Sequence, residues 1–320
     1  MLSIDNTYDE EGLREWYARV VRGLEPREVD GGTGLFAAVE GREGAEKAAG
    51  VELVCDPKID GLALSLRYEE GRLVHAVTRG DGTSGDDVTH AARVIRSIPL
   101  TLRDQGEIPR VLEVRGEVYM PSEAFEKLNA EREAEGEELL MNPRNATAGT
   151  LKNLDPKVAA GRGLRFCAHG RGEIEVREAG DEATFAASHS EFLSKIRALG
   201  VPTSPHTTRS KALEGAIAAI RAFDTQRREL GYATDGMVVR VDSFAQQREL
   251  GVTSKSPRWV VAYKYPAERT TTRLLDVLHQ VGKTGKVTPR AVMEPVLLAG
   301  SVVRHATLHN YGRIRDAGTE

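Results

Sequence analysis

Two short apolar runs, residues 51–54 and 62–66, stand on either side of a polar stretch at residues 55–61. In the second run, leucines alternate with smaller or polar residues, which is the period-two pattern of a strand with one buried face. A Glu-Gly pair follows, and residues 73–78 are again largely apolar, so these two segments should form a hairpin. The pattern therefore predicts that Lys58, inside the polar stretch, lies at the end of a strand beside a turn.

Apolar positions that recur every three to four residues predict helices elsewhere in the chain. The expected helices cover residues 9–24, 88–98, 122–136, 188–200 and 213–223. Further strands are expected at residues 110–119, 236–241 and 259–265. After residue 266, short apolar runs alternate with glycine turns, a pattern typical of a small β-barrel. The sequence thus predicts an α+β domain at residues 1–267 and the first strands of a β-module at residues 268–320.

At 320 residues the chain exceeds the usual size of one domain, which agrees with one large domain and part of a second. Its hydrophobic content of 40% with charges of both signs is typical of a globular protein. No apolar run approaches the roughly 18 to 20 residues of a membrane span, and no basic and apolar leader opens the chain, so a cytoplasmic location is expected. The two cysteines, Cys55 and Cys167, are too few for a disulfide framework or a four-thiolate zinc site.

The formal net charge of −4 conceals an uneven distribution along the chain. Residues 251–320 carry 11 Lys or Arg against 5 Asp or Glu, whereas residues 1–250 carry 33 against 43. A basic segment attached to an acidic body is typical of a nucleic-acid contact surface. Solvated charged faces without a partner account equally well for these counts, so charge alone leaves both interpretations open.

Lys58 could be a nucleophile or an ordinary surface cation. A lysine amine, with an ordinary pKa of about 10.4, becomes nucleophilic when burial or nearby cations lower that value. Arg240 and Lys264 can supply cations, because each alternates onto one face of an otherwise apolar strand. Glu117 lies in a third apolar strand and could hold a ribose hydroxyl or a metal ion. Cations in such positions need an anion, so the pattern indicates either a phosphate-handling site or a set of structural ion pairs.

Two segments match phosphate-binding loops in outline but not in context. Residues 80–85 fit the G-x-G-x-x-G pattern, yet the preceding strand belongs to a hairpin and three aspartates in and after the loop would repel phosphates. Residues 282–284 resemble the end of a P-loop, but Val277 stands where that motif requires glycine. Neither segment is expected to bind a nucleotide.

The tetrapeptide Lys58-Ile59-Asp60-Gly61 resembles the K-x-D-G motif of the covalent nucleotidyltransferases, which are the DNA ligases, RNA ligases and mRNA capping enzymes. The longer surroundings resemble the bacterial NAD-dependent DNA ligases. The similar stretches are residues 1–6, 78–82, 113–118, 142–151, 235–240, 257–266, 280–285 and 306–310. The stretch that contains Asn142-Pro143-Arg144-Asn145 is peculiar to the NAD-dependent branch, and it is the strongest of these signals.

The resemblance implies a nucleotidyltransferase domain with ATP-grasp-like antiparallel sheets and helices at residues 1–267, followed by the N-terminal part of an OB-fold at residues 268–320. It also implies a reaction in three steps. Lys58 would attack the α-phosphate of NAD and expel nicotinamide mononucleotide; the AMP would then pass to the 5′-phosphate of a nick in double-stranded DNA, and the 3′-hydroxyl would displace it. The implied catalytic residues are Lys58, Asp60 and Lys264.

The same resemblance assigns nucleotide contacts. Lys264 would contact the α-phosphate, and Glu117 would hold the ribose with Arg79 nearby. Ser3 and Ile4 fall at further nucleotide contacts. Mg²⁺ or Mn²⁺ would assist by neutralising phosphate charge, with Glu117 as its nearest carboxylate.

The implied contacts to the base are His169, which would stack on the adenine, and Asp56 and Arg240. Three positions depart from what the family usually has. The family usually has Lys in place of Arg240, Glu in place of Asp56, and Arg in place of Lys152. A bulkier guanidinium and a shorter carboxylate would change how the base is held.

Several parts of such ligases have no counterpart in this sequence: the N-terminal domain that binds the nicotinamide mononucleotide half of NAD, and the zinc-finger, helix-hairpin-helix and BRCT regions. We therefore expect a monomeric catalytic fragment or truncated product that acts in a bacterial cytoplasm, with zinc bound only in the missing C-terminal region. We expect it to bind adenine nucleotide but to react poorly with NAD, and to be incomplete for full nick sealing. Two alternatives stay open. The chain could be an ATP-dependent ligase or capping-type transferase that uses the same lysine, or a non-catalytic nucleic-acid-binding remnant.

Overall fold

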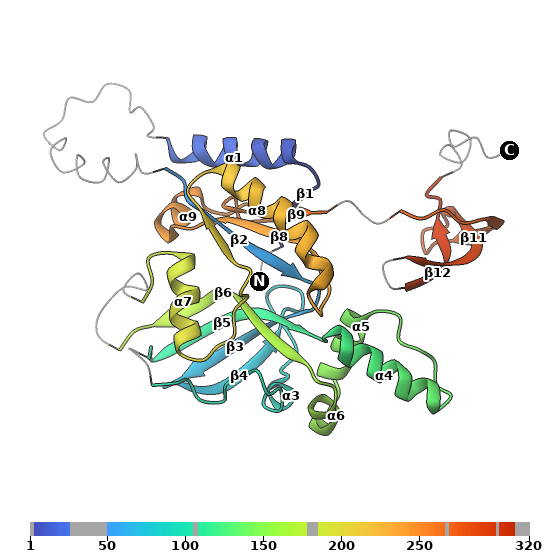
Figure 1. The fold of residues 1–320 in the computed structure, drawn as a ribbon, viewed down its shortest axis with the longest axis horizontal. Helices are drawn as coiled ribbons and strands as arrows, with labels where there is room; N and C mark the ends of the chain where they lie inside the picture. Colours follow the sequence, from blue (N-terminus) through green and yellow to red (C-terminus); the bar gives the residue numbers. More distant parts are fainter. Residues whose placement is uncertain are drawn as a thin grey trace, which may run out of the picture. The chain divides into compact units, whose positions relative to one another are not determined.

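The computed structural model describes residues 3–25, 50–104, 108–177, 185–265, 269–298 and 301–310 (Figure 1). The chain forms two compact units, one made of Met1–Glu138 and Pro143–Tyr265 and the other of Leu139–Asn142 and Pro266–Glu320. The domain boundary expected after residue 267 lies outside the described residues. Within the described part, the larger unit contains two sheets and the smaller unit contains one.

A five-stranded sheet in the larger unit carries many of the candidate residues. Its strands, in spatial order, are β1 (Asp5–Thr7), β9 (Val260–Lys264), β8 (Thr234–Val241), β2 (Leu53–Ile59) and β7 (Thr208–Ser210). β1 runs parallel to β9, and the other neighbouring strands are antiparallel. The strands expected at residues 236–241 and 259–265 are confirmed, and β8 is the central strand.

Helices α1 (Glu10–Leu24) and α8 (Leu213–Gln226) cover one face of this sheet (Figure 1). α1 begins after Asp9, whose carboxylate accepts a hydrogen bond from the Gly12 backbone N–H at 2.8 Å and so caps the helix. Buried positions recur every three or four residues in both helices, as the apolar pattern predicted. The shared core includes Leu13, Trp16, Val20, Leu213, Ile217, Ile220 and Phe223 from the helices, and Leu53, Cys55, Met237, Val239, Val241 and Val261 from the sheet.

A second, four-stranded antiparallel sheet completes the larger unit. Its strands, in spatial order, are β4 (Arg72–Thr78), β3 (Leu62–Glu69), β5 (Val111–Tyr119) and β6 (Arg165–Glu175). The predicted hairpin of β3 and β4 is confirmed, with Glu70 and Gly71 at positive φ in its turn. α7 (His189–Ala198) packs on β6 and begins after Ser188, whose hydroxyl accepts the Glu191 backbone N–H at 3.2 Å, as the capping pattern predicted.

The remaining helices are α3 (Thr89–Ala92), α4 (Ser122–Ala134), α5 (Pro143–Leu151), α6 (Pro156–Gly161), α9 (Phe244–Leu250) and the 3₁₀ turn η2 (Arg227–Glu229). α4 matches the helix expected at residues 122–136. The helix expected at residues 88–98 was wrong in extent, because only α3 is helical. After it, the N–H groups of Val94 and Ile95 bond to carbonyls three residues back, so the chain continues in turns while Ile95 still reaches the core.

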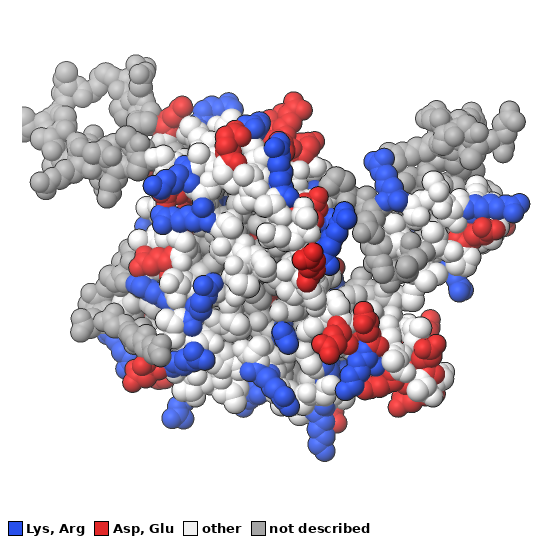
Figure 2. Space-filling view, in the orientation of Figure 1, with Lys and Arg blue, Asp and Glu red and all other residues white. Residues whose placement is uncertain are grey.

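The smaller unit is an antiparallel meander of β10 (Leu274–Val281), β11 (Val287–Leu298) and β12 (Ser301–Thr307). Gly285, at a φ of 79°, lies in the turn between the first two strands, and the glycine-separated strands expected after residue 266 are confirmed. Acidic and basic side chains are interspersed over the face of the molecule shown in Figure 2. No helix among the described residues combines the length and the apolar character needed to cross a membrane.

Candidate active site

Two lysines project from the face of the first sheet that the helices leave uncovered. Lys58 of β2 lies directly opposite Gly236 of β8, which in turn lies opposite Lys264 of β9. Residues directly opposite each other share one face of a sheet, so both lysines point to the same side. A Cβ atom at Gly236 would lie 2.1 Å from the Tyr263 carbonyl oxygen, so this position excludes a side chain. The two cations therefore stand on either side of a strand position that has no side chain.

Asp235, the residue before that glycine, contacts both lysines. Its carboxylate lies 3.0 Å from the Lys58 Nζ atom through Oδ1 and 3.5 Å from the Lys264 Nζ atom through Oδ2. The sequence pattern did not single out Asp235 as a site residue, although it belongs to one of the stretches similar to the ligases. Its one local signal was an acidic residue immediately before the glycine of an apolar strand.

The prediction that Lys58 lies at the end of a strand beside a turn is confirmed, because β2 ends at Ile59 and a turn follows. The strand begins before Lys58 and includes Pro57, which is buried, and both residues pair with β8. The register shifts only after Lys58, and the turn begins at Asp60, whose N–H bonds to the Ala233 carbonyl. At Gly61 a Cβ atom would lie 2.3 Å from the Val118 carbonyl oxygen, so the turn passes close to the second sheet.

The same face of the first sheet, opposite α1 and α8, carries a buried pair of opposite charges. Asp56 of β2 and Arg240 of β8 are only 3% and 6% exposed, and the Arg240 Nη2 atom lies 3.2 Å from Asp56 Oδ2. His189, which is 2% exposed, places its Nε2 atom 3.1 Å from the same oxygen. The Thr207 hydroxyl donates to Asp56 Oδ1 at 2.7 Å. Asp56 and Arg240, which the resemblance implied as contacts to the base, are thus paired with each other; the contacts of His189 and Thr207 to Asp56 were not predicted.

Burial and charge together set the ionisation of this cluster. Burial alone would raise the pKa of Asp56, but the Arg240 charge and the hydrogen bonds from His189 and Thr207 outweigh burial and hold that pKa below its ordinary value. Burial, reinforced by the Arg240 charge, lowers the pKa of His189. Burial also lowers the pKa of Arg240 against the pull of Asp56, although a guanidinium stays charged. Near neutral pH, a neutral His189 therefore donates its Nε2 proton to an ionised Asp56.

Arg240 also joins the two sheets. Its Nη1 atom donates to the His169 carbonyl of β6 at 2.9 Å. Glu117 of β5 lies directly opposite Cys167 of β6, and its Oε1 atom is 3.8 Å from His169 Nε2. Within the described part of the chain, Glu117 Oε2 and Arg240 Nε are buried without a hydrogen-bond partner. An acceptor and a donor beside His169 are therefore free for a ligand to satisfy.

Arg79 brings the start of the chain to the second sheet. Its Nη2 atom donates to the Ser3 hydroxyl at 2.7 Å. Its backbone N–H donates to the Ala63 carbonyl of β3, and Ala63 lies directly opposite Glu117 of β5. Ser3, Arg79 and Glu117 are thus placed along one side of the site. Ile4, the residue after Ser3, is half-buried.

Asp60 is directed to a different partner. Its Oδ1 atom accepts from Arg144 Nη1 of α5 at 2.9 Å, so the stretch peculiar to the NAD-dependent branch packs beside the end of β2. Lys152, where the family usually has arginine, pairs with Asp86 at 2.7 Å. No group of three or more His, Cys, Asp or Glu among the described residues is placed to hold a metal ion.

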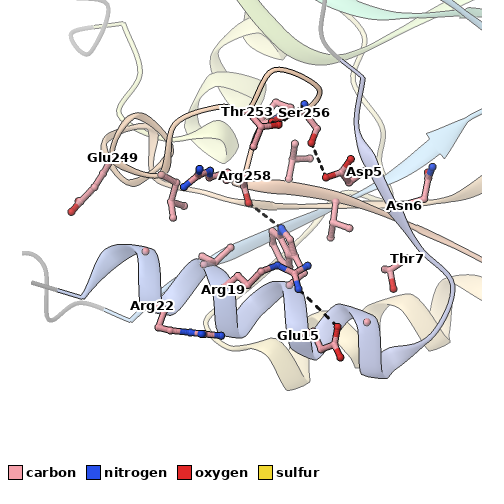
Figure 3. A pocket seen from close by; sticks show the side chains of 18 residues that line it. Asp5, Asn6, Thr7, Glu15, Arg19, Arg22, Glu249, Thr253, Ser256 and Arg258 are labelled. Carbon is pink, nitrogen blue, oxygen red and sulfur yellow. Dashed lines mark hydrogen bonds and ion pairs between the residues drawn. The ribbon is translucent and has the colours of Figure 1, made fainter. Parts of the chain in front are cut away.

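A cavity of about 680 Å³ lies elsewhere, between α1, β1 and the segment around Ser256 (Figure 3). Trp16 is one of the lining residues, and its indole N–H donates to the Arg258 carbonyl at 3.1 Å. Figure 3 shows Ser256 bonded to Asp5, at a distance of 2.7 Å. None of the candidate residues lines it. The two lysines on either side of Gly236, together with the neighbouring buried Asp56–Arg240 pair, instead define the candidate site on the face of the first sheet opposite α1 and α8.

The sequence matches two family models in order. Residues 37–268 match the NAD-dependent DNA ligase adenylation domain, and residues 271–320 match the NAD-dependent DNA ligase OB-fold domain. A DNA ligase from Pseudomonas entomophila is 44% identical over 99% of this chain and 38% of its own length. A DNA ligase from Porphyromonas gingivalis is 46% identical over 97% of this chain and 42% of its own length. The chain therefore belongs to the NAD-dependent DNA ligase family, and the expected α+β nucleotidyltransferase and OB-fold architecture is confirmed.

The chain spans about two fifths of the length of the curated relatives that it matches. Among solved structures, the mycobacterial DNA ligase D complexed with ATP and MES matches 82% of this chain and 68% of its own length, at 12% identity and a TM-score of 0.37. A likeness that distant adds nothing to the assignment, which rests on the family models and the curated relatives.

Proposed function

We propose that this chain carries out the covalent AMP transfer that begins NAD-dependent DNA ligation. The Lys58 amine attacks the α-phosphate of NAD; a nitrogen–phosphorus bond forms, the bond to nicotinamide mononucleotide breaks, and the amine loses its proton. The observation that carries this proposal is the register of Lys58, Gly236 and Lys264 across three strands. A phosphate bound between the two lysines would meet the nucleophile on one side and a cation on the other, with no side chain at Gly236 between them.

The residues around the nucleophile have separate roles in this proposal. Lys264 binds the α-phosphate and stabilises the charge that develops on its oxygens. Asp235 lies within reach of the Lys58 and Lys264 amines and holds them on either side of Gly236. Asp60, fixed by Arg144, sets the turn that follows Lys58. The phosphate replaces Asp235 as the partner of Lys264 once NAD is bound.

The buried charge pair is suited to adenine. An ionised carboxylate can only accept hydrogen bonds, and a guanidinium can only donate them. The pairing edge of adenine offers the complementary order, an amino donor next to a ring-nitrogen acceptor. Asp56 and Arg240 would therefore contact the base, His169 would stack on it, and Glu117 would hold the ribose together with Arg79, while Ser3 and Ile4 make further nucleotide contacts.

A divalent ion, Mg²⁺ or Mn²⁺, is part of the proposal. Mg²⁺ in proteins usually binds through one or two carboxylates together with phosphates and water. Glu117 fits this role, because its Oε2 atom is buried and has no hydrogen-bond partner in the described part of the chain. The bound ion would neutralise phosphate charge during transfer.

The later steps rest on the family rather than on this geometry. The AMP would pass to the 5′-phosphate of nicked double-stranded DNA, and the 3′-hydroxyl would then close the strand during DNA replication and repair. In this proposal residues 1–267 are the adenylation domain and residues 268–320 are part of the OB-fold. The protein would act as a monomer in a bacterial cytoplasm, and zinc would be bound by other parts of the ligase.

Intact mass spectrometry of the 320-residue chain tests the first step. After incubation with NAD and Mg²⁺, with the N-terminal domain of a related ligase supplied in trans, the unchanged chain should gain the mass of one AMP, and Lys58→Ala should gain none. Lys127→Ala is a matched control, because Lys127 is an exposed lysine on α4, and it should gain AMP like the unchanged chain. A parallel incubation with ATP tests the alternative donor. Labelling of Lys58→Ala, or no labelling of the unchanged chain by either donor, would overturn the proposal.

A further inference from the structure

Two residues outside β2 and β8 hold the buried Asp56–Arg240 pair through contacts to Asp56. His189 stands at the start of α7, and Thr207 precedes β7. Both donate to Asp56, one to each carboxylate oxygen. Asp56 contacts Arg240, and Arg240 contacts the His169 carbonyl. A continuous line of contacts therefore runs from α7 through both sheets to the residue proposed to stack on the base.

A count of hydrogen-bond sites shows how firmly Asp56 is fixed. A carboxylate offers about four acceptor positions, two on each oxygen. Oδ2 receives His189 and Arg240, and Oδ1 receives Thr207, so one position on Oδ1 stays open for a ligand. Without Thr207, only the two contacts on Oδ2 would oppose rotation of the carboxylate about its Cβ–Cγ bond. The open acceptor position would then lose its direction.

We propose that His189 and Thr207 are positioning residues for base selection: they fix Asp56, and through it Arg240, so that an acceptor and a donor meet the nucleobase edge in a set order. This inference rests on the proposed binding of adenine nucleotide. Neither residue touches the nucleotide, and their effect is on which base is accepted. The lowered pKa values of Asp56 and His189 agree with this role, since an ionised carboxylate and a neutral imidazole keep the order of donors and acceptors fixed.

The order of groups predicts a preference that can be measured. Adenine presents an amino donor beside a ring-nitrogen acceptor, whereas hypoxanthine presents a carbonyl acceptor beside a ring N–H donor. In a fixed Asp56–Arg240 pair, the acceptor Asp56 meets the amino donor of adenine and the donor Arg240 meets its ring nitrogen. With hypoxanthine, acceptor would meet acceptor and donor would meet donor. AMP and IMP share the same phosphate and ribose, so their relative affinity reports only the base contacts. A change that loosens Asp56 should weaken AMP binding and leave IMP binding almost unaltered.

The test is calorimetric titration of the full chain with AMP and, separately, with IMP. Thr207→Val removes the hydroxyl with little change in shape, and it should weaken AMP binding by about tenfold, the equivalent of one hydrogen bond to a charged group. Thr203→Val is the matched control, because Thr203 is also half-buried in the same segment and accepts from Arg197 rather than contacting Asp56. It should bind both nucleotides as the unchanged chain does.

His189 gives a second, independent arm. His189→Leu should lower the preference for AMP over IMP as Thr207→Val does, while His189→Gln, which keeps a side-chain donor, should restore most of it. Thermal unfolding of each variant shows that the folded chain is being titrated, and Thr207→Val keeps the test valid if His189→Leu does not fold.

The outcomes separate this inference from the proposed function. If the unchanged chain prefers AMP and both Thr207→Val and His189→Leu keep that preference, the positioning role is wrong and the nucleotide site stands. The role is equally wrong if the variants lose AMP and IMP affinity to the same extent, since that pattern indicates general damage to the fold. Binding of neither nucleotide by the unchanged chain would overturn both proposals.

Discussion

Replacing Gly236 with alanine should damage AMP transfer through the spacing of two strands. The added Cβ atom would lie 2.1 Å from the Tyr263 carbonyl oxygen, and real Cβ contacts essentially never fall below 3.0 Å. The obstructing atom is backbone, so β8 and β9 must separate by about 0.9 Å, the difference between these values, since a close-packed interior offers no slack. Lys264 lies directly opposite Gly236 and must move with β9.

A displacement of that size has two measurable consequences. Misplacing a catalytic group by about 1 Å costs on the order of 100-fold in rate, so the AMP adduct on Lys58 should form about 100-fold more slowly. Overpacking of this kind costs about 1–3 kcal/mol of the free energy of unfolding. Timed intact mass spectrometry with NAD measures the first quantity, and urea denaturation measures the second.

Gly161→Ala is the matched control, because a Cβ atom there has no heavy atom within 4 Å. It should leave the rate of adduct formation unchanged and alter the free energy of unfolding by less than about 1 kcal/mol. If Gly236→Ala forms the adduct at the unchanged rate and unfolds at the same urea concentration, the proposal that the phosphate binds beside Gly236, between the two lysines, is refuted.

Three further outcomes follow from the site. Lys264→Ala should slow adduct formation by about 100- to 1,000-fold in the same assay, because it removes the cation beside the phosphate; a rate within tenfold of normal contradicts that role. Burial and the Arg240 charge lower the pKa of His189, so below about pH 6.5 the unfolded chain binds a proton that the folded chain does not. Urea denaturation should therefore show that the free energy of unfolding falls from pH 7.5 to 5.5. The fall should be smaller in His189→Gln. Equal slopes in both proteins would argue against this coupling. Burial raises the pKa of Cys55 and Cys167 to about 12, so iodoacetamide at pH 8 should label neither thiol before urea unfolds the chain, as peptide mass spectrometry would show.

Strand periodicity predicted the faces of the first sheet correctly. Side chains alternate with a period of two, so Arg240 had to share a face with Val238, and Lys264 with Val260 and Ala262. The structure confirms both sets, because the opposite positions of β8 and β9 pack under α1 and α8. The local rule needs no knowledge of neighbouring strands, which is why the sequence alone was sufficient.

The partners of those charges could not be predicted in the same way. Asp235 stands beside the lysines because of how β2, β8 and β9 align, and no local pattern encodes that alignment. Thr207 and His189 reach Asp56 across 151 and 133 residues of sequence from segments without strand periodicity. β6, which carries His169, was missed because its glycines and charges interrupt the alternation.

The order of strands in the first sheet has a consequence for how the protein is made. β1 pairs with β9, so residues near the start of the chain bond to residues 261–263, and Lys58 gains its cationic neighbour only when β8 and β9 are available. A ribosome releases the chain from its N-terminus, and the second sheet needs no residue beyond Glu175. That sheet can pair early in synthesis, whereas Lys58 and Lys264 are brought together only after β9 has emerged. A nascent chain can thus carry a paired second sheet before it carries the pair of lysines on the first.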